Sequence, residues 1–234
     1  PSAQPTVTAT RKGARRLRSG IPWVFRGEVA EAEEARSSAI VTVTESTRQP
    51  HRPGVLGGPL ALRLLTRGRE RVDTGSFSRA DPSLLERRGA LFPNDDAYRV
   101  FHGEADLLPG LFVDRYADGL TVQLIPMGME ARRSEIVTVL DELLKPRVIA
   151  VRNDTAARDF EGLDAGGDAA YREGPNLFEI DLMEDLKTGS FLDQRENHLR
   201  VAEKARGGRD LFGYHGGFAL SLARRCQSVV AVEH

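Results

Sequence analysis

The residues with the clearest chemical potential lie in two segments near the end of the 234-residue chain. The first, from Lys187 to Asn197, is dense in side chains that form hydrogen bonds, and it opens a helix. The second is a glycine-rich turn, Gly213 to Gly217, between a short strand and another helix. Glycines at such a turn let a ligand approach the backbone closely, and free N–H groups at a helix start favour anionic groups. This order predicts a binding corner for a cofactor that contains a nucleoside.

Two acids are placed to bind the polar parts of such a cofactor. Asp210 precedes the glycine turn, where its carboxylate can orient a positively charged amino group. Glu233 stands at the end of the next predicted strand, where an acid can accept both ribose hydroxyls. The combination suits S-adenosylmethionine, with its ammonium, carboxylate and ribose. A nicotinamide cofactor is the weaker interpretation, because the turn reads G-Y-H-G-G-F and the dinucleotide fingerprint G-x-G-x-x-G is missing.

Four predicted elements must position this corner. The polar segment continues as a helix to Ala205, and Gly207 and Gly208 end it. A strand at 210–212, a helix at 218–225 and a strand at 228–232 then follow. The alternation of strands and helices indicates a parallel α/β arrangement.

The N-terminal segment predicts a small β-barrel. Strands are expected at 6–10, 39–44 and 60–65, where β-branched and apolar residues gather, and one or two helical turns at 15–19. The segments 48–54 and 57–59 are rich in proline and glycine and are expected to be loops. Trp23 and Phe25 follow Pro22, which excludes a helix interior, and both are expected in the barrel core.

Basic residues gather in this segment, although the whole chain has a formal net charge of −1. Residues 11–26 contain no acid and hold Arg11, Lys12, Arg15, Arg16, Arg18 and Arg26. Such a patch is either a solvated surface cluster or a site for a polyanion. Because guanidinium groups pair with phosphate bidentately, Arg15, Arg16 and Arg18 are the candidates for RNA contact.

The middle of the chain predicts a compact α+β unit, followed by a polar linker at 164–170. Its expected elements are helices at 82–90 and 130–144 and strands at 98–101, 111–116, 120–125, 148–152 and 177–182, of which 111–116 and 120–125 form a hairpin. His102, Glu104 and Asp106 alternate along the chain and could face one side of an extended segment. A Pro-Gly turn follows them and no second histidine pair is near, so a loop is favoured over a metal site.

The composition is that of an ordinary soluble globular protein, with 40% hydrophobic and 29% charged residues. No apolar run is long enough to span a bilayer. The single cysteine, Cys226, excludes an internal disulfide framework and fits a reducing compartment, so a cytoplasmic location is expected. Cys226 lies near the end of the helix that follows the glycine turn, on the wrong side of that turn, and no catalytic role is expected for it.

Three sequence patterns resemble one bacterial family. R-R-L-R-S-G-I-P-W-V-F-R-G-E-V resembles the start of a PUA domain, an RNA-binding pseudo-barrel. H-G-E-A-D-L-L-P-G-L-F-V-D-R-Y resembles a central segment of certain RNA methyltransferases. K-T-G-S-F-L-D-Q-R-E-N, followed by D-L-F-x-Y-x-G-G-F, resembles the methyltransferases that make 5-methylcytosine in 23S ribosomal RNA.

The resemblance implies a mixed α/β fold in three parts. These are an N-terminal PUA-like β-barrel at 1–70, a central α+β domain at 71–185, and the start of a Rossmann-like class I methyltransferase domain at 186–234. It also implies S-adenosyl-L-methionine as cofactor and ribosomal RNA as partner. A homodimer is left open.

The same resemblance implies roles for the residues of the corner. Six residues help to close the cofactor pocket: Lys187, Thr188, Phe191, Asp193, Gln194 and Arg195. The first glycine loop is formed by Asp210, Phe212, Tyr214 and Gly216, and Glu233 holds the ribose. Gly213 departs from the Cys, Ser or Ala that is commoner at that place. We expect the change to be tolerated with a looser loop.

The family's reaction needs groups that this chain is not expected to contain. In the family a cysteine attacks carbon 6 of cytosine, carbon 5 takes the methyl group, and a base removes the proton from carbon 5. The resemblance places these groups beyond His234, so we expect a chain truncated early in the catalytic domain and inactive by itself. Two alternatives stay open: an RNA methyltransferase for another base, such as guanine at N7, and a non-catalytic RNA-binding module.

Overall fold

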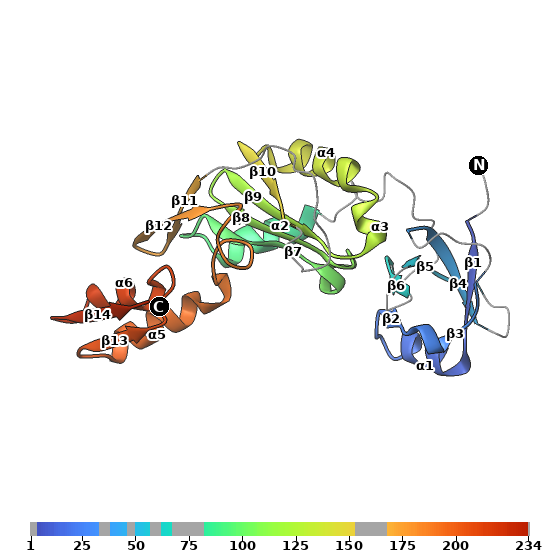
Figure 1. Ribbon diagram of the computed structural model, residues 1–234, viewed down its shortest axis with the longest axis horizontal. Coiled ribbons are helices and arrows are strands. Elements are labelled where there is room, and N and C mark those ends of the chain that lie inside the picture. Colours follow the sequence, from blue (N-terminus) through green and yellow to red (C-terminus); the bar gives the residue numbers. More distant parts are fainter. Residues whose placement is uncertain are drawn as a thin grey trace.

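The computed structural model describes residues 4–32, 38–45, 50–56, 62–66, 82–152 and 168–233. Figure 1 shows an N-terminal sheet at one end, a second sheet with helices in the middle, and the last helices and strands at the other end. Within the described residues no helix is long and apolar enough to cross a membrane. The arrangement is the mixed α/β fold that the sequence predicts.

The N-terminal sheet has six strands in the order β2-β6-β5-β4-β1-β3. Their bounds are β1 (Thr6–Ala9), β2 (Trp23–Val24), β3 (Val29–Ala32), β4 (Ile40–Glu45), β5 (Pro50–Leu56) and β6 (Leu62–Leu64). β1 runs parallel to β4, whereas its pairing with β3 is antiparallel. Helix α1 (Arg11–Arg18) begins after Thr10, whose hydroxyl accepts a hydrogen bond from the N–H of Gly13. It covers the core with Ala14 and Leu17.

Two expectations for this sheet are wrong. The segment from Pro50 belongs to strand β5 rather than to a loop, and it lies between β4 and β6. The prolines made this strand hard to predict, because a proline such as Pro53 has no N–H to donate to a neighbouring strand. The pairing of β4 with β5 is also irregular between Thr42 and Thr44. Phe25 is 42% exposed instead of buried, because the preceding Val24 takes the inward position. Trp23 is half-buried, and residues 57–59 lie outside the described residues.

A buried carboxylate fixes α1 to the chain that follows β2. Glu28 is 3% exposed and accepts hydrogen bonds from Nε and Nη2 of Arg16, both at 3.0 Å. Its carboxylate also accepts from the N–H of Phe25 at 3.3 Å. The bidentate pair with Arg16 holds the pKa of Glu28 below its ordinary value. Arg16 is therefore committed to a partner within the fold.

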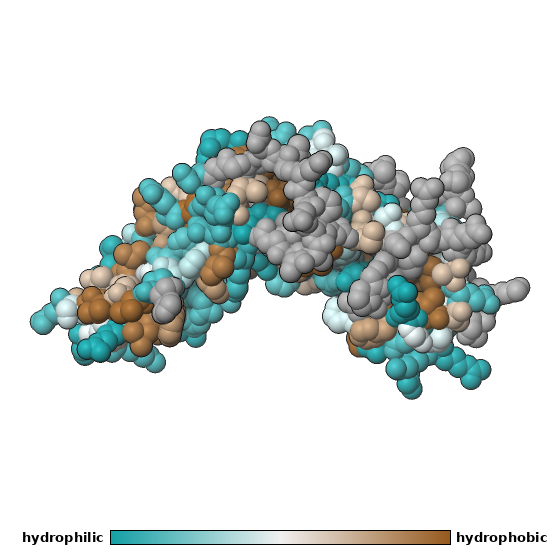
Figure 2. Space-filling view, in the orientation of Figure 1, coloured by the Kyte–Doolittle hydropathy of each residue, from teal (hydrophilic) through white to brown (hydrophobic). Residues whose placement is uncertain are grey.

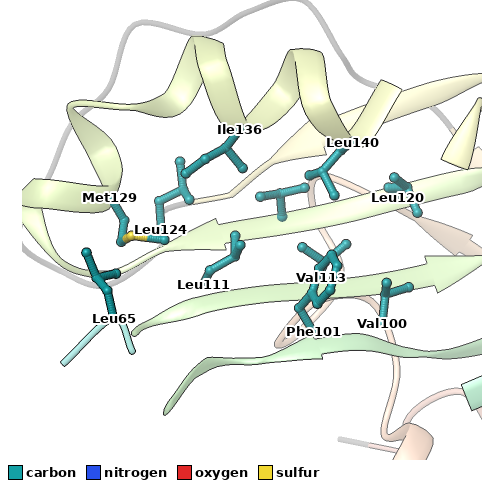
Figure 3. Packing of buried hydrophobic residues seen from close by; sticks show 11 residues of the cluster. Leu65, Val100, Phe101, Leu111, Val113, Leu120, Leu124, Met129, Ile136 and Leu140 are labelled. Carbon is teal, nitrogen blue, oxygen red and sulfur yellow. The ribbon is translucent and has the colours of Figure 1, made fainter. Parts of the chain in front are cut away.

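The central sheet has the strand order β10-β9-β8-β7. Its strands are β7 (Ala97–His102), β8 (Leu111–Tyr116), β9 (Gly119–Leu124) and β10 (Val148–Val151), and its helices are α2 (Pro82–Leu91), α3 (Met127–Glu130) and α4 (Arg133–Leu144). The predicted hairpin is confirmed as β8 and β9, and β10 runs parallel to β9. Figure 3 shows Met129, Ile136 and Leu140 of α3 and α4 packed over Leu111, Val113 and Leu124 of the sheet.

The helix expected at 130–144 is divided into α3 and α4. The break falls at Ala131 and Arg132. The guanidinium of Arg132 donates to the carbonyls of Gly128 at 2.6 Å and Ser38 at 3.0 Å. This contact ties the break to the N-terminal part of the chain, which local helix propensity cannot reveal.

A hairpin covers the other side of the central sheet. Its strands are β11 (Asp168–Glu173) and β12 (Asn176–Asp181), paired antiparallel. Tyr171 and Phe178 of the hairpin pack with Tyr116 of β8 and with Ala97 and Ala150. The linker predicted at 164–170 is wrong for residues 168–170, which begin β11. Small alanines at 169 and 170 hid the alternation of buried and exposed positions.

The last part of the chain forms α5 (Arg195–Lys204), β13 (Gly208–Leu211), α6 (Gly217–Ala223) and β14 (Val229–Val232). β13 and β14 pair in parallel, as predicted. Several apolar side chains of this part stay exposed: Leu211, Phe212, Leu220, Val230 and Val232. Figure 2 shows apolar surface at this end of the molecule. An exposed apolar patch of this kind is typical of an interaction surface.

The contact between Arg16 and Glu28 makes the stability of the fold depend on pH. Because the folded-state pKa of Glu28 is lowered, its contribution is present above the ordinary glutamate pKa of about 4.3 and is lost as pH falls through the lower folded-state value. We expect Glu28→Gln to lower the free energy of unfolding by about 1–3 kcal/mol at pH 7, and by less in acid. Urea unfolding across this pH range measures the difference.

The matched control is Glu31→Gln, on the exposed side of β3. It should change the free energy of unfolding by less than about 0.5 kcal/mol. Equal effects of the two substitutions at pH 7 would contradict the role given to Glu28.

Candidate functional site

A cavity of about 390 Å³ lies where hairpin β11–β12, the polar segment, α5 and the glycine turn meet. Residues predicted for cofactor binding line it from both sides: Lys187, Phe191, Asp193, Gln194, Asp210, Phe212 and Tyr214. The structure thus brings together the two segments that the sequence singled out. A volume of this size is within the range of small-molecule sites, roughly 300–1,000 Å³.

The glycine turn is built around the carboxylate of Asp210. Asp210 is 8% exposed, and its Oδ2 accepts a hydrogen bond of 2.9 Å from the N–H of Ala219 in the first turn of α6. A Cβ on Gly213 would lie 2.9 Å from the same Oδ2, closer than real side chains allow. Gly213 therefore lets the turn close onto the carboxylate of Asp210. The looser loop expected from this residue stays a prediction.

Backbone strain is concentrated in the same turn. Phe212 and Tyr214 have φ values of 62° and 50°, and Gly216, which precedes α6, has a φ of 74°. For residues other than glycine such values are uncommon, and strained backbone of this kind often occurs at ligand-binding turns. Phe212 is 78% exposed while it lines the cavity, so its ring is available to a ligand.

Glu233 reaches the turn from the end of β14. Its Oε2 accepts a hydrogen bond of 2.6 Å from the N–H of Tyr214. The carboxylate is exposed and therefore combines a structural contact with access to solvent. This places an acid next to the glycine turn at the carboxyl end of the second parallel strand, as the sequence predicts.

Tyr214 and His215 fasten the turn to the polar segment. The hydroxyl of Tyr214 accepts from the N–H of Leu186 at 2.6 Å, and His215 Nε2 lies 3.0 Å from the carbonyl oxygen of Gly189. Burial raises the pKa of Tyr214 above its ordinary value, so the hydroxyl stays protonated at neutral pH. The two halves of the cavity are consequently held in a fixed relation.

Ser190 is held by two tyrosines from beneath. Its N–H donates to the hydroxyl of Tyr116 at 2.9 Å, and its own Oγ accepts from the hydroxyl of Tyr171 at 2.8 Å. Burial raises the pKa of Tyr171 to about 12 and raises that of Tyr116 as well. Both hydroxyls remain neutral, and the polar segment rests on the central sheet and its hairpin.

Thr188 and Arg195 do not line the cavity. Thr188 is 2% exposed, and its hydroxyl donates to the carboxylate of Asp114 in β8. Arg195 is 6% exposed, lies 3.2 Å from a carboxylate oxygen of Asp95, and donates to the carbonyl of Ala97. Both side chains anchor the polar segment to the central sheet. Gly216 and Glu233 likewise contribute to the turn without lining the cavity.

The sequence did not reveal a buried pair, His198 and Glu173, that closes one side of the cavity. His198 Nδ1 lies 2.7 Å from Oε1 of Glu173, and the imidazole packs edge-on against Phe218 with ring centroids 4.5 Å apart. His198 was visible on the predicted helix, but Glu173 lies in β11, the strand that sequence reasoning missed. The pair joins hairpin, α5 and α6 behind the cavity.

The candidate RNA-binding arginines differ in their contacts with other residues of the chain. Arg16 forms the bidentate pair with Glu28, and its guanidinium lies over the ring of Phe25 at 4.9 Å. Arg18 donates to the carboxylate of Glu45 at 3.1 Å. Arg15 is exposed on α1. The three do not present equal charge to a partner.

The loop after β7 distributes its acids among separate partners. Glu104 lies 3.4 Å from Arg63, and Asp106 pairs with Arg88 at 3.1 Å. His102 donates its backbone N–H to Asp106 at 2.6 Å. These contacts describe a loop satisfied by ion pairs. Cys226 is half-buried after α6 and is not among the residues that line the cavity.

Comparisons with known proteins match the N-terminal domain by itself and most of the chain as a whole. A family model described as a PUA-like domain matches residues 7–56, which confirms the predicted N-terminal domain type. Ribosomal RNA large subunit methyltransferase I of Klebsiella pneumoniae is 32% identical over 91% of this chain and 58% of its own length. The protein of the same name from Erwinia tasmaniensis is also 32% identical, with the same coverage. The chain thus spans 58% of the length of these relatives.

Solved structures share the fold. "A putative sam-dependent methyltransferase from Streptococcus mutans" has a TM-score of 0.80 and 16% identity, over 97% of this chain and 63% of the other. SMU.776, "a putative methyltransferase complexed with SAH", has the same TM-score and identity over 97% and 62%. At this identity the likeness is one of fold.

The close contact of Gly217 with His198 gives a test of the site's packing. A Cβ on Gly217 would lie 2.4 Å from Cε1 of His198. Overpacking costs about 1–3 kcal/mol, whereas alanine gains at most about 1 kcal/mol in helix propensity. We expect Gly217→Ala to lower the thermal midpoint of unfolding, and to be neutral or stabilising in the His198→Ala background.

The control is Gly207→Ala, where the nearest atom to a new Cβ is the carbonyl oxygen of Ser228 at 3.7 Å. A loss of stability from Gly217→Ala that persists without the imidazole would rule out this contact as its cause.

Proposed function

We propose that the chain is part of an S-adenosylmethionine-dependent methyltransferase that modifies large-subunit ribosomal RNA, with carbon 5 of cytosine as the methylated position. The observation that carries the proposal is the joining of Asp210, the strained glycine turn and Glu233 at the carboxyl ends of two parallel strands. The names of the relatives and the SAH complex of a structure with the same fold supply the chemistry.

The residues of the cavity and of the adjoining turn fit the parts of this cofactor. Asp210, which lines the cavity, is placed for the ammonium group. Glu233, which contacts the turn at Tyr214 from outside the cavity lining, is assigned to the ribose hydroxyls. Lys187, Phe191, Asp193 and Gln194 line the opposite side, so they would close the site and limit its exposure to water. When bound, the cofactor supplies an electrophilic methyl group; the chain's own residues bind and orient it.

The PUA-like domain supports RNA as the substrate. Its helix α1 carries Arg11 and Arg15 as exposed side chains. Lys12 is exposed as well, but its ammonium group lies 3.3 Å from a carboxylate oxygen of Glu28. A helix with this charge suits a phosphate backbone, and phosphate contacts position a protein on RNA without reading its sequence. A non-catalytic RNA-binding module, the second candidate, shares this feature but needs no cofactor cavity.

Calorimetry with S-adenosylhomocysteine tests the cofactor assignment. Asp210→Asn keeps an acceptor for the Ala219 N–H but removes the charge, and Glu233→Gln does the same at the turn's other side. If each carboxylate makes a charge-assisted contact, each variant should bind more weakly by about 1–3 kcal/mol.

Glu196→Gln is the matched control, since Glu196 is exposed on α5 and does not line the cavity. Binding of S-adenosylhomocysteine that is unchanged in both the Asp210 and the Glu233 variant would refute the assignment. RNA binding without any cofactor binding would favour the RNA-binding module.

The RNA face of α1 is tested by the salt dependence of binding. Arg15→Gln should weaken binding of a ribosomal RNA fragment and reduce the slope of log K against log salt concentration by about 0.7–0.9, with unchanged stability. Arg16→Gln should instead lower stability, because it removes the two hydrogen bonds that the Arg16 guanidinium donates to the buried Glu28 carboxylate. An Arg15 variant with the wild-type salt slope would remove this residue from the interface.

A further inference from the structure

A second cavity, of about 370 Å³, lies on the other side of the polar segment. Its central-domain side is formed by Arg88, Phe92, Tyr98, Arg99, His102 and Asp114. Lys187, Ser190 and Asp193 line both this cavity and the first one. The two cavities therefore share one wall. We refer to the second as the central cavity.

The central cavity contains aromatic and guanidinium surfaces of the kind that stack on nucleobases. The rings of Phe92 and Tyr98 are stacked, with centroids 6.3 Å apart and planes at 20°. The buried guanidinium of Arg195 packs 4.5 Å from the centroid of the Phe92 ring and helps to hold that ring in place. Both rings are half-buried, so part of each remains open to the cavity. Unpaired RNA bases are recognised by stacking on such rings and guanidinium planes.

The same cavity contains two guanidinium groups, each held by a carboxylate. Asp114 binds Nε and Nη2 of Arg99, both at 2.8 Å, and Asp106 binds Nη2 of Arg88. Nη1 of Arg99 points to His102, at 3.4 Å from its Nδ1. Nε of Arg88 is buried and has no hydrogen-bond partner among the described residues. Guanidinium groups fixed in this way are pre-organised to donate to a phosphate or a base edge.

The size of the cavity limits what it can hold. About 370 Å³ lies near the lower end of the range for small-molecule sites, roughly 300–1,000 Å³, which fits one nucleotide rather than several. The acids that pair with the arginines also limit its net positive charge, so stacking must contribute to binding alongside phosphate contacts. An unpaired strand satisfies both conditions, whereas the bases of a duplex are not free to stack on protein rings.

We propose that the central cavity binds one nucleotide of a single-stranded RNA segment, with its base on the Phe92 and Tyr98 rings and its phosphate or base edge on Arg88 and Arg99. The inference rests on the proposed function, because it takes the occupant of the first cavity to be the methyl donor for an RNA substrate. It adds a substrate-binding surface in the central domain to that of the PUA-like domain.

Fluorescence anisotropy with a labelled single-stranded oligocytidylate measures the interaction on the full chain. Phe92→Leu and Tyr98→Leu keep apolar volume but remove the ring face, and each should weaken binding about tenfold. Arg88→Gln should weaken it as well. Arg87→Gln, one position away on the exposed side of α2, removes the same charge outside the cavity and should bind as the wild type does.

A cross-linking measurement covers the case in which a variant fails to fold. An oligonucleotide that carries 5-iodocytidine is irradiated with the wild-type chain, and the cross-linked peptide is identified by mass spectrometry. Cross-links to peptides that contain Phe92 or Tyr98 support the proposal. Cross-links confined to the PUA-like domain would overturn it, as would unchanged oligonucleotide affinity in the folded ring variants.

Binding of S-adenosylhomocysteine to the same variants separates this inference from the proposed function. Normal cofactor-analogue binding together with weakened oligonucleotide binding supports the central cavity. Normal binding of both ligands overturns the central cavity alone. A wild-type chain that binds the oligonucleotide at the Phe92 and Tyr98 peptides but not S-adenosylhomocysteine refutes the methyl-donor assignment and leaves the nucleotide site standing.

Discussion

The carboxylate of Asp114 lies in the interior strand β8, is 1% exposed, and accepts hydrogen bonds from Arg99 and from Thr188. A buried carboxylate without such partners would cost several kcal/mol, so its presence forces both neighbours into place. Arg99 fixes one wall of the central cavity, and Thr188 fixes the polar segment. The positions of Lys187 and Ser190 on either side of Thr188 follow from this anchor. Both cavities depend on it.

A second set of contacts explains why the glycine turn meets this segment. Tyr116 and Tyr171 hold Ser190 from the central sheet and its hairpin, while Tyr214 and His215 reach the segment from the turn. These groups come from β8, from β11 and from the glycine turn. The cavity is therefore a product of the whole C-terminal half, in which a central sheet supports one wall and two parallel strands present the other.

The sequence predicted the parts of the site in which a few neighbouring residues determine both the local backbone structure and the proposed contacts with a ligand. The turn from Gly213 to Gly217 is needed for close approach of the backbone, and Asp210 and Glu233 follow from their places at strand ends. Strands with clear alternation, such as β8 and β9, were equally visible. In these cases a few adjacent residues are enough to predict the local structure.

The remaining features depend on burial, which a sequence does not state. Thr188 and Arg195 have side chains that could bind a ligand. In the structure, however, Thr188 donates a hydrogen bond to Asp114, and Arg195 forms an ion pair with Asp95. Strand β5 was hidden by prolines and β11 by alanines, and without β11 the partnership of His198 with Glu173 could not be found. The sequence correctly predicted that α1 is basic. It did not reveal that Arg16 pairs with Glu28 and Arg18 with Glu45.

The wall that the two cavities share has a consequence for how their ligands influence each other. Lys187, Ser190 and Asp193 line both cavities, so a ligand that displaces these side chains in one cavity would change the lining of the other. Equilibrium binding is reciprocal: whatever factor one ligand imposes on the affinity of the second, the second imposes on the first. With both proposed ligands, the seven residues from Lys187 to Asp193 would therefore link the two affinities, and Thr188, held by Asp114, is where this segment is anchored.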